Sequence, residues 1–121
     1  MEITATEDDG IWIAVLDGKL DTASSVGAEA KLIELVDAGA DRLVLDFAAV
    51  DYIASSGLRA LLKLAQRMQK DDGVLHLCCL NDMVSDVFEI SGFDRILTVF
   101  DTEDQAVEAL VARREIPPSK E

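Results

Sequence analysis

The feature of this chain that most constrains its fold is the regular alternation of short aliphatic runs with longer segments of helical periodicity. Two strand-like stretches come first, at residues 3–7 and 11–16, joined by the turn sequence DDG. Three further runs, DRLVLDF, GVLHLCCL and ILTVF, follow, and a helix-like segment precedes and follows each. The expected order is β-β-α-β-α-β-α-β-α. Because strands joined through helices usually pair in parallel, the sequence predicts an α/β domain with a mixed sheet of about four to five strands and about four helices.

Local signals mark the expected helices. The segment that begins at Ser55 has the strongest pattern, with an apolar stripe and a separate basic stripe. Asn81 and Gly92 have the residue types of an N-cap and a C-terminal stop, so they bound a shorter helix. The apolar stripe is expected at Leu58, Leu61, Leu62, Ala65 and Met68, and the basic stripe at Arg59, Lys63, Arg67 and Lys70.

The length of 121 residues fits one domain. There is no internal repeat and no linker, so we expect residues 1–114 to form that domain and residues 115–121 to form a flexible tail. Half of the residues are hydrophobic but only 5% are aromatic, which predicts an aliphatic core.

The chain is strongly acidic, with 24 Asp and Glu against 11 Lys and Arg and a formal net charge of -13. Such a surface repels phosphate backbones and anionic lipid, so neither nucleic acid nor membrane is an expected partner. No apolar run approaches the ~20 residues of a membrane span, and the acidic N-terminus does not resemble a signal peptide. We expect a cytoplasmic protein whose partners are other proteins.

Cys78 and Cys79 are adjacent in an expected strand, where neighbouring side chains point to opposite faces. This geometry predicts two small buried hydrophobes that cannot share a metal ion. His76 lies in the same run without a ligand pattern around it, so a structural role is expected for it too. We therefore expect neither a metal site nor a cofactor.

The sequence ASSGL at residues 54–58 raises the question of whether Ser55 or Ser56 takes part in chemistry. A serine-hydrolase elbow needs glycine two places before and two places after the nucleophile, and neither serine has both. No phosphate-binding glycine loop is present, so we do not expect an enzyme. From the residues alone, capping of the following helix is the simpler interpretation. Gly57, unfavourable in a first helical turn, indicates that another backbone or a partner comes close there.

A phosphoacceptor receiver domain is an alternative class of α/β protein in which neither serine is the modified residue. In it, Asp46, at the end of the RLVLDF run, would be the phosphoacceptor beside the acidic TEDD sequence. Three features count against it. The first strand alternates in polarity, a second strand follows where a receiver has a helix, and no lysine follows the last strand.

The segment LVLDFAAVDYIASSGLRALLKLAQ resembles the hallmark segment of STAS domains, in particular the bacterial anti-sigma factor antagonists. Two other segments agree. GKLDTASS is similar to the family's Gly-x-Leu-Asp motif before the first helix, and SDVFEISGFDRILTVFDTEDQAVEAL is similar to its C-terminal part. The resemblance covers essentially the whole chain.

This resemblance implies a partner switch controlled by phosphorylation. The unmodified antagonist binds a protein that is both anti-sigma factor and serine kinase, phosphorylation releases it, and a serine phosphatase resets it. Ser55 matches the phosphorylated serine, and Ser56 is the second choice. The implied partner-binding residues are Asp21, Ala54, Ser55, Ser56 and Gly57, and we add Arg59 and Lys63 from the basic stripe. Because many phosphorylated members have an acidic residue where this chain has Ala54, a STAS adaptor without a phosphorylation cycle is the second interpretation.

Overall fold

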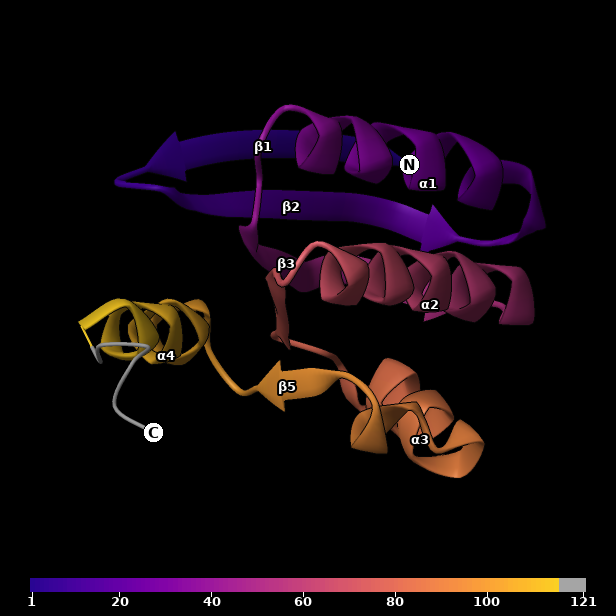
Figure 1. Ribbon diagram of the computed structural model, residues 1–121. Helices are drawn as coiled ribbons and strands as arrows, with labels where there is room; N and C mark the ends of the chain where they lie inside the picture. The colour runs from indigo at the N-terminus through magenta and orange to yellow at the C-terminus, as the bar shows by residue number, and fades with distance from the viewer. Residues whose placement is uncertain (116–121) are drawn as a thin grey trace.

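The computed structural model of the protein describes residues 1–115, with side chains as far as Ala112. Five strands and four α-helices follow one another in the predicted order, with one short 3-10 helix between α3 and β5 (Figure 1). The elements are β1 Glu2–Asp8, β2 Ile11–Leu20, α1 Thr22–Asp37, β3 Arg42–Ile53, α2 Ser55–Lys70, β4 Val74–Cys78, α3 Asp82–Ser91, the 3-10 helix Phe93–Arg95, β5 Thr98–Phe100 and α4 Glu103–Glu115. Helix α4 includes Glu115, and the rest of the predicted tail lies outside the described residues.

The strands form one mixed sheet in the order β1-β2-β3-β4-β5. Strands β1 and β2 are an antiparallel hairpin, and all later pairs are parallel, as predicted. The hairpin turns through Asp9 and Gly10, which both have positive φ, as a two-residue turn between twisted strands requires. This sheet order differs from the 2-1-3-4-5 order of the flavodoxin-like receiver fold, and the first strand pair is antiparallel. The fold therefore contradicts the receiver interpretation.

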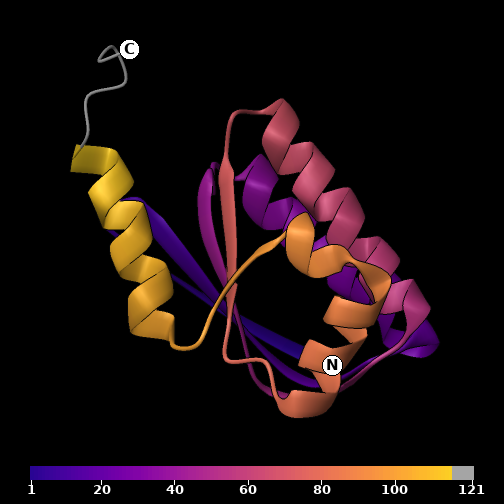
Figure 2. The same ribbon diagram turned by 90° about the horizontal axis from the view of Figure 1, so that it is seen from below.

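The helices are divided unequally between the two faces of the sheet. Figure 2 shows α1, α2 and α3 on one face and α4 on the other (Figure 2). The larger aliphatic core lies under the three helices and is centred on residues such as Leu45, Phe47, Leu61 and Phe88. The smaller core under α4 contains Ile11, Val44, Cys78, Ala106 and Leu110. The sheet is thus covered on both sides, which explains the near-continuous apolar run at residues 43–45.

Strands β2 and β3 are longer than predicted. The predicted run DRLVLDF ends at Phe47, but β3 continues through AAVDYI as far as Ile53. Two register shifts interrupt the β2–β3 pairing, and beyond them the strands still pair as far as Leu20 and Ile53. Val50 and Ile53 remain buried there, so packing holds the irregular stretch in the sheet.

The predicted ends of α3 are confirmed. The side chain of Asn81 accepts a hydrogen bond from the Val84 N–H at 2.8 Å, and Gly92 ends the helix in the left-handed conformation. The predicted stripe of α2 is only partly right. Leu58, Leu61 and Met68 are buried, but Leu64 is buried in place of the expected Leu62 and Ala65, which are half-exposed.

Candidate functional site

The strand ends before α1 and α2 lie side by side and form the candidate site, which we call the serine edge: Asp21, Thr22, Ser25, Ala54, Ser55, Ser56 and Gly57. Leu20 ends β2 beside Ile53, which ends β3. The Ala54 N–H donates to the Leu20 carbonyl oxygen at 2.9 Å and continues the pairing beyond the strand. As a result, both helices begin at the same place, with their N-terminal turns together.

Gly57 is where the two chain segments come closest. A Cβ atom at this position would lie 2.7 Å from the Leu20 carbonyl oxygen, 2.8 Å from Leu20 Cγ and 3.0 Å from Ile53 Cγ1. No side chain fits there without a shift of the backbone. The prediction of a close approach is confirmed, and the approaching group is the backbone of β2.

Neither serine caps α2. The N-cap residue is Ala54, with extended backbone angles, and no side chain makes a cap hydrogen bond. Ser55 is therefore the first residue inside the helix rather than its cap, and the capping interpretation was wrong. Its side chain is exposed, and within residues 1–115 it makes no side-chain hydrogen bond. The hydroxyl of Ser55 is free at the start of α2.

Ser56 has a different environment from its neighbour. Its hydroxyl oxygen lies 3.1 Å from that of Ser25 and 3.4 Å from that of Thr22, both on α1. Ser56 is half-exposed, and Ser25 is buried and also donates to the Asp21 carbonyl oxygen. Ser56 therefore links the first turns of α1 and α2.

Asp21 is the N-cap of α1. Its carboxylate accepts from the Ala23 and Ser24 N–H groups, each at 3.1 Å, and the Ser24 hydroxyl accepts from the Asp21 N–H at 3.0 Å, which completes a capping box. The Ser24 N–H bond is the largest of the effects that lower the pKa of Asp21 below its ordinary value of 3.8. The structure thus places Asp21 at the same edge as Ser55, where its carboxylate stays ionised.

The basic stripe of α2 divides into two parts. Arg67 makes ion pairs with Asp37 of α1 at 2.7 Å and with Asp71 at 2.9 Å. Arg59 and Lys63 are exposed, and neither makes an ion pair within the part of the chain that the structure describes. Arg67 thus joins α1 to α2, whereas the two cations nearer to Ser55 stay open to a partner.

Sequence reasoning did not single out Thr22 and Ser25, whose hydroxyls hold Ser56. A signal for Ser25 was present, because Ser25 comes three residues before Ala28 and shares the buried face of α1 with Ala28, Leu32 and Val36. A polar residue on an apolar helix face requires a polar partner, but the sequence does not say which one.

A second group of polar side chains lies on the α4 face, and we call it the thiol–carboxylate cluster: Asp46, Cys78, Cys79 and Glu103. The prediction that the two cysteines point to opposite faces was wrong. Strand β4 ends at Cys78, and Cys79 has a φ of 67°, which breaks the strand alternation. The sulfurs of the two cysteines lie within 4.8 Å of each other, and burial raises the pKa of both thiols.

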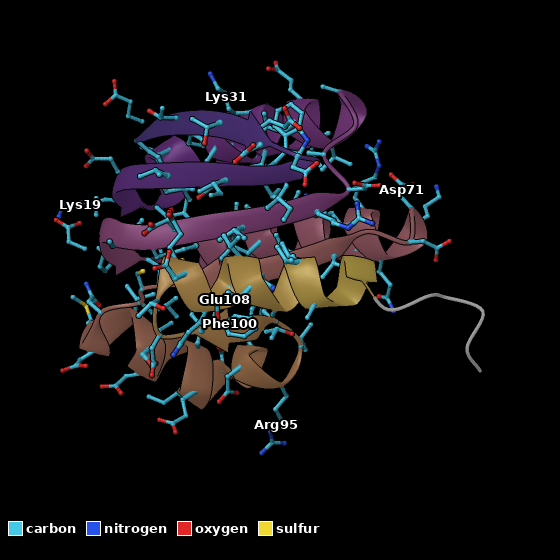
Figure 3. All side chains as sticks on the ribbon, turned by 90° about the vertical axis from the view of Figure 1, so that its left-hand side faces the viewer. Lys19, Lys31, Asp71, Arg95, Phe100 and Glu108 are labelled. Atoms are coloured by element: carbon cyan, nitrogen blue, oxygen red, sulfur yellow. The ribbon has the colours of Figure 1, made fainter. Side chains whose placement is uncertain are left out.

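The structural role predicted for His76 is consistent with its surroundings. It is buried on the α4 face, where its Nδ1 lies 3.1 Å from the Ala106 carbonyl oxygen. Its ring lies 4.8 Å from that of Phe100. Figure 3 looks onto this face and shows Phe100 beside α4 (Figure 3).

The chain belongs to the STAS domain family, because the model of that family matches residues 2–106. It is 41% identical over 109 residues to a Bordetella bronchiseptica protein that carries the provisional name of an anti-sigma factor antagonist, BtrV; the match covers 90% of this chain and 94% of that one. No helix in the described residues is long and apolar enough to cross a bilayer.

Solved structures of STAS proteins share the fold. A Thermotoga maritima protein with the provisional name of an anti-sigma factor antagonist superimposes with a TM-score of 0.84 at 19% identity, over 88% of this chain and 92% of that one. The phosphorylated form of the Bacillus protein SpoIIAA superimposes with a TM-score of 0.69 at 20% identity, over 90% of this chain and 99% of that one. The predicted fold class is confirmed.

Proposed function

We propose that this STAS domain is an anti-sigma factor antagonist that binds an anti-sigma factor with serine kinase activity, and that phosphorylation of Ser55 releases it. The name of the Bordetella relative supports the first part. The observation that carries the second is the contrast between the two serines. The Ser55 hydroxyl is exposed and free of side-chain hydrogen bonds in residues 1–115, whereas the Ser56 hydroxyl is bound to α1. A kinase can reach the first without breaking contacts.

The start of α2 suits a phosphate group. Ala54 offers no side-chain acceptor, so the first N–H groups of the helix are left for another acceptor. A phosphate on Ser55 gains these donors and the favourable end of the helix dipole. We therefore expect phosphorylation to leave the domain folded. SpoIIAA offers a parallel, since its unphosphorylated and phosphorylated structures both match this chain with a TM-score of 0.69.

Release then follows from electrostatics at the docking surface. Arg59 and Lys63 lie four and eight residues after Ser55, so all three share one side of α2. A phosphate adds a charge of about −1.5 to −2 to a surface that the partner covers, and it also pairs with Arg59, one turn away. Asp21, Ala54, Ser56 and Gly57 complete the proposed docking surface. A serine phosphatase restores the binding form.

Phosphorylation with the cognate kinase and ATP tests the proposal. Intact-mass measurement is expected to show one added phosphoryl group on the wild type and on Ser56→Ala, and none on Ser55→Ala. A phosphoryl group that is found on Ser55→Ala but not on Ser56→Ala would assign the phosphorylation site to Ser56 instead.

Binding of the kinase tests the switch itself. Ser55→Asp is expected to bind at least tenfold more weakly, which corresponds to about 1.4 kcal/mol. Ser55→Asn is the matched control, because it has the same size without the charge, and it should bind nearly as the wild type does. Equal affinity of a folded Ser55→Asp variant would contradict release by charge.

The second candidate is a STAS adaptor that binds its partner without a phosphorylation cycle. Ala54 favours it, since this position is acidic in many phosphorylated relatives. The mass experiment separates the two, because an adaptor binds the partner but acquires no phosphoryl group on either serine.

A further inference from the structure

The thiol–carboxylate cluster brings together four side chains from three elements. Asp46 of β3 lies beside Cys78 of β4 in the strand register, Cys79 follows directly, and Glu103 is the first residue of α4. A carboxylate oxygen of Asp46 and the sulfurs of Cys78 and Cys79 all lie within 4.8 Å of one another. Glu103 lies close enough to Asp46 for their two carboxyl groups to interact.

The backbone turns the second thiol toward the first. Cys79 has a left-handed backbone, which is uncommon for a residue with a side chain, and its N–H donates to the Phe100 carbonyl oxygen of β5 at 3.2 Å. The backbone of Glu103 also lies near the Cys79 thiol, so the start of α4 faces the same side chain. Neighbouring cysteines in a regular strand could not converge in this way.

The cluster is accessible from solvent. Cys78 is fully buried, but Asp46, Cys79 and Glu103 are each half-exposed, so an ion can reach the three outer groups without unfolding the domain. The neighbourhood is otherwise apolar, with Val44, Phe100 and the α4 core residues around it. The cluster therefore offers a metal ion two soft donors, the sulfurs, and two hard donors, the carboxylate groups.

We propose that this cluster binds a thiophilic divalent cation of the Zn²⁺ class. Two thiolates and two carboxylates fit tetrahedral zinc coordination, while Mg²⁺ and Ca²⁺ prefer oxygen ligands alone. At a Zn–S distance of ~2.3 Å, tetrahedral geometry places two sulfurs about 3.8 Å apart. The observed limit of 4.8 Å requires only small side-chain movements to reach that arrangement. A bound ion would join β3, β4 and α4.

This site is separate from the proposed switch. Asp46 and Ile53 are seven residues apart on β3, about 23 Å for an extended strand, and the cluster lies on the α4 face whereas α2 lies on the opposite one. The ion is therefore expected to stabilise the domain without contacting Ser55.

Cobalt titration of the full-length, tag-free protein tests the proposal. The protein is reduced, freed of metal with EDTA and titrated anaerobically with Co²⁺. We expect a thiolate-to-cobalt charge-transfer band and the intense visible bands of a tetrahedral ion, both lost on addition of Zn²⁺. Zn²⁺ should also raise the thermal unfolding midpoint in a concentration-dependent way, because it binds the folded state.

Variants of the cluster separate coordination from folding. Cys79→Gly should weaken the charge-transfer band, because one of the two thiolates is lost, and should reduce the Zn²⁺-dependent rise in midpoint. It should keep the fold because glycine favours the left-handed backbone. Asp46→Asn and Glu103→Gln should each weaken cobalt binding at least tenfold. Glu108→Gln is the control, since Glu108 is exposed elsewhere on α4, and it should bind as the wild type does (Figure 3).

Three results would overturn the proposal. The first is a fully reduced wild-type protein that gives no charge-transfer band. The second is a band of undiminished intensity in Cys79→Gly. The third is a Zn²⁺-dependent rise in midpoint that is the same in Cys79→Gly and Asp46→Asn as in the wild type. Phosphorylation of Ser55 is measured independently, so none of these results bears on the proposed function.

Discussion

The serine edge and the thiol–carboxylate cluster both lie where strands end and helices begin, but their polar groups are arranged in opposite ways. At the serine edge, Asp21 accepts backbone N–H bonds that lower its pKa. In the cluster, the Asp46 carboxyl group and burial raise the pKa of Glu103. The Asp21 carboxylate accepts hydrogen bonds from its own helix, whereas the Glu103 carboxyl group faces Asp46 and two thiols.

This difference indicates which chemistry each region supports. The polar groups of the serine edge are bound to each other, apart from the outward-facing Ser55 hydroxyl, so the region offers a rigid surface with one modifiable group. The side chains of the cluster converge on one another, and like-charged ligands held together favour a cation between them. Docking and covalent modification suit the first arrangement, and ion binding suits the second.

The largest expected effect tests the rigidity of the serine edge. Gly57→Ala should destabilise the domain by about 2–3 kcal/mol, because its Cβ would overlap the Leu20 backbone and the Ile53 side chain. Urea unfolding measures the change. Gly27→Ala on α1 is the matched control, since a Cβ there meets nothing within 4 Å, and it should stabilise by about 0.5–1 kcal/mol. Equal effects of the two variants would show that close backbone approach does not define this edge.

A smaller effect is expected for charge reversal on the docking surface. Lys63→Glu and Arg59→Glu should each weaken binding to the kinase by roughly twofold to tenfold and reduce its salt dependence. Binding titrations at two salt concentrations measure both quantities. Lys31→Glu, an equal charge change on the exposed side of α1, should leave the affinity nearly unchanged. Unchanged affinity and salt dependence in Arg59→Glu and Lys63→Glu would exclude these cations from the interface.

The smallest expected effect concerns the charge on Asp21. The lowered pKa means that the ionised carboxylate stabilises the folded state above pH 3.8, and that this stabilisation is lost as the pH falls through the folded-state pKa. Asp21→Asn should therefore lower the urea unfolding midpoint slightly at neutral pH. The difference in midpoint between the variant and the wild type should disappear at acid pH. Asp86→Asn, an exposed site on α3, is the control for a general charge effect. A gap that does not depend on pH would contradict the role of the charge.

Much of the fold follows from local signals. The order of elements, the parallel pairing after the first hairpin, the Asn81 cap and the Gly92 stop each depend on a few neighbouring residues, and all were predicted correctly. The end of β3 was missed, because the apolar run stops at Phe47 and the mixed segment AAVDYI is kept in the sheet by packing and by its pairing with β2. The close approach at Gly57 was predicted, but the approaching segment lies 37 residues earlier in the chain.

The sequence by itself determined the α/β architecture, the acidic surface, and the family resemblance that singled out Ser55. Only the tertiary structure decided that Ser55 is free and Ser56 is bound, since the hydroxyls that hold Ser56 belong to another helix. It also decided that Cys78 and Cys79 point the same way, because one left-handed residue reverses the strand alternation. Periodicity is a local property of the chain, whereas the partner of a side chain depends on which distant segments the fold brings together.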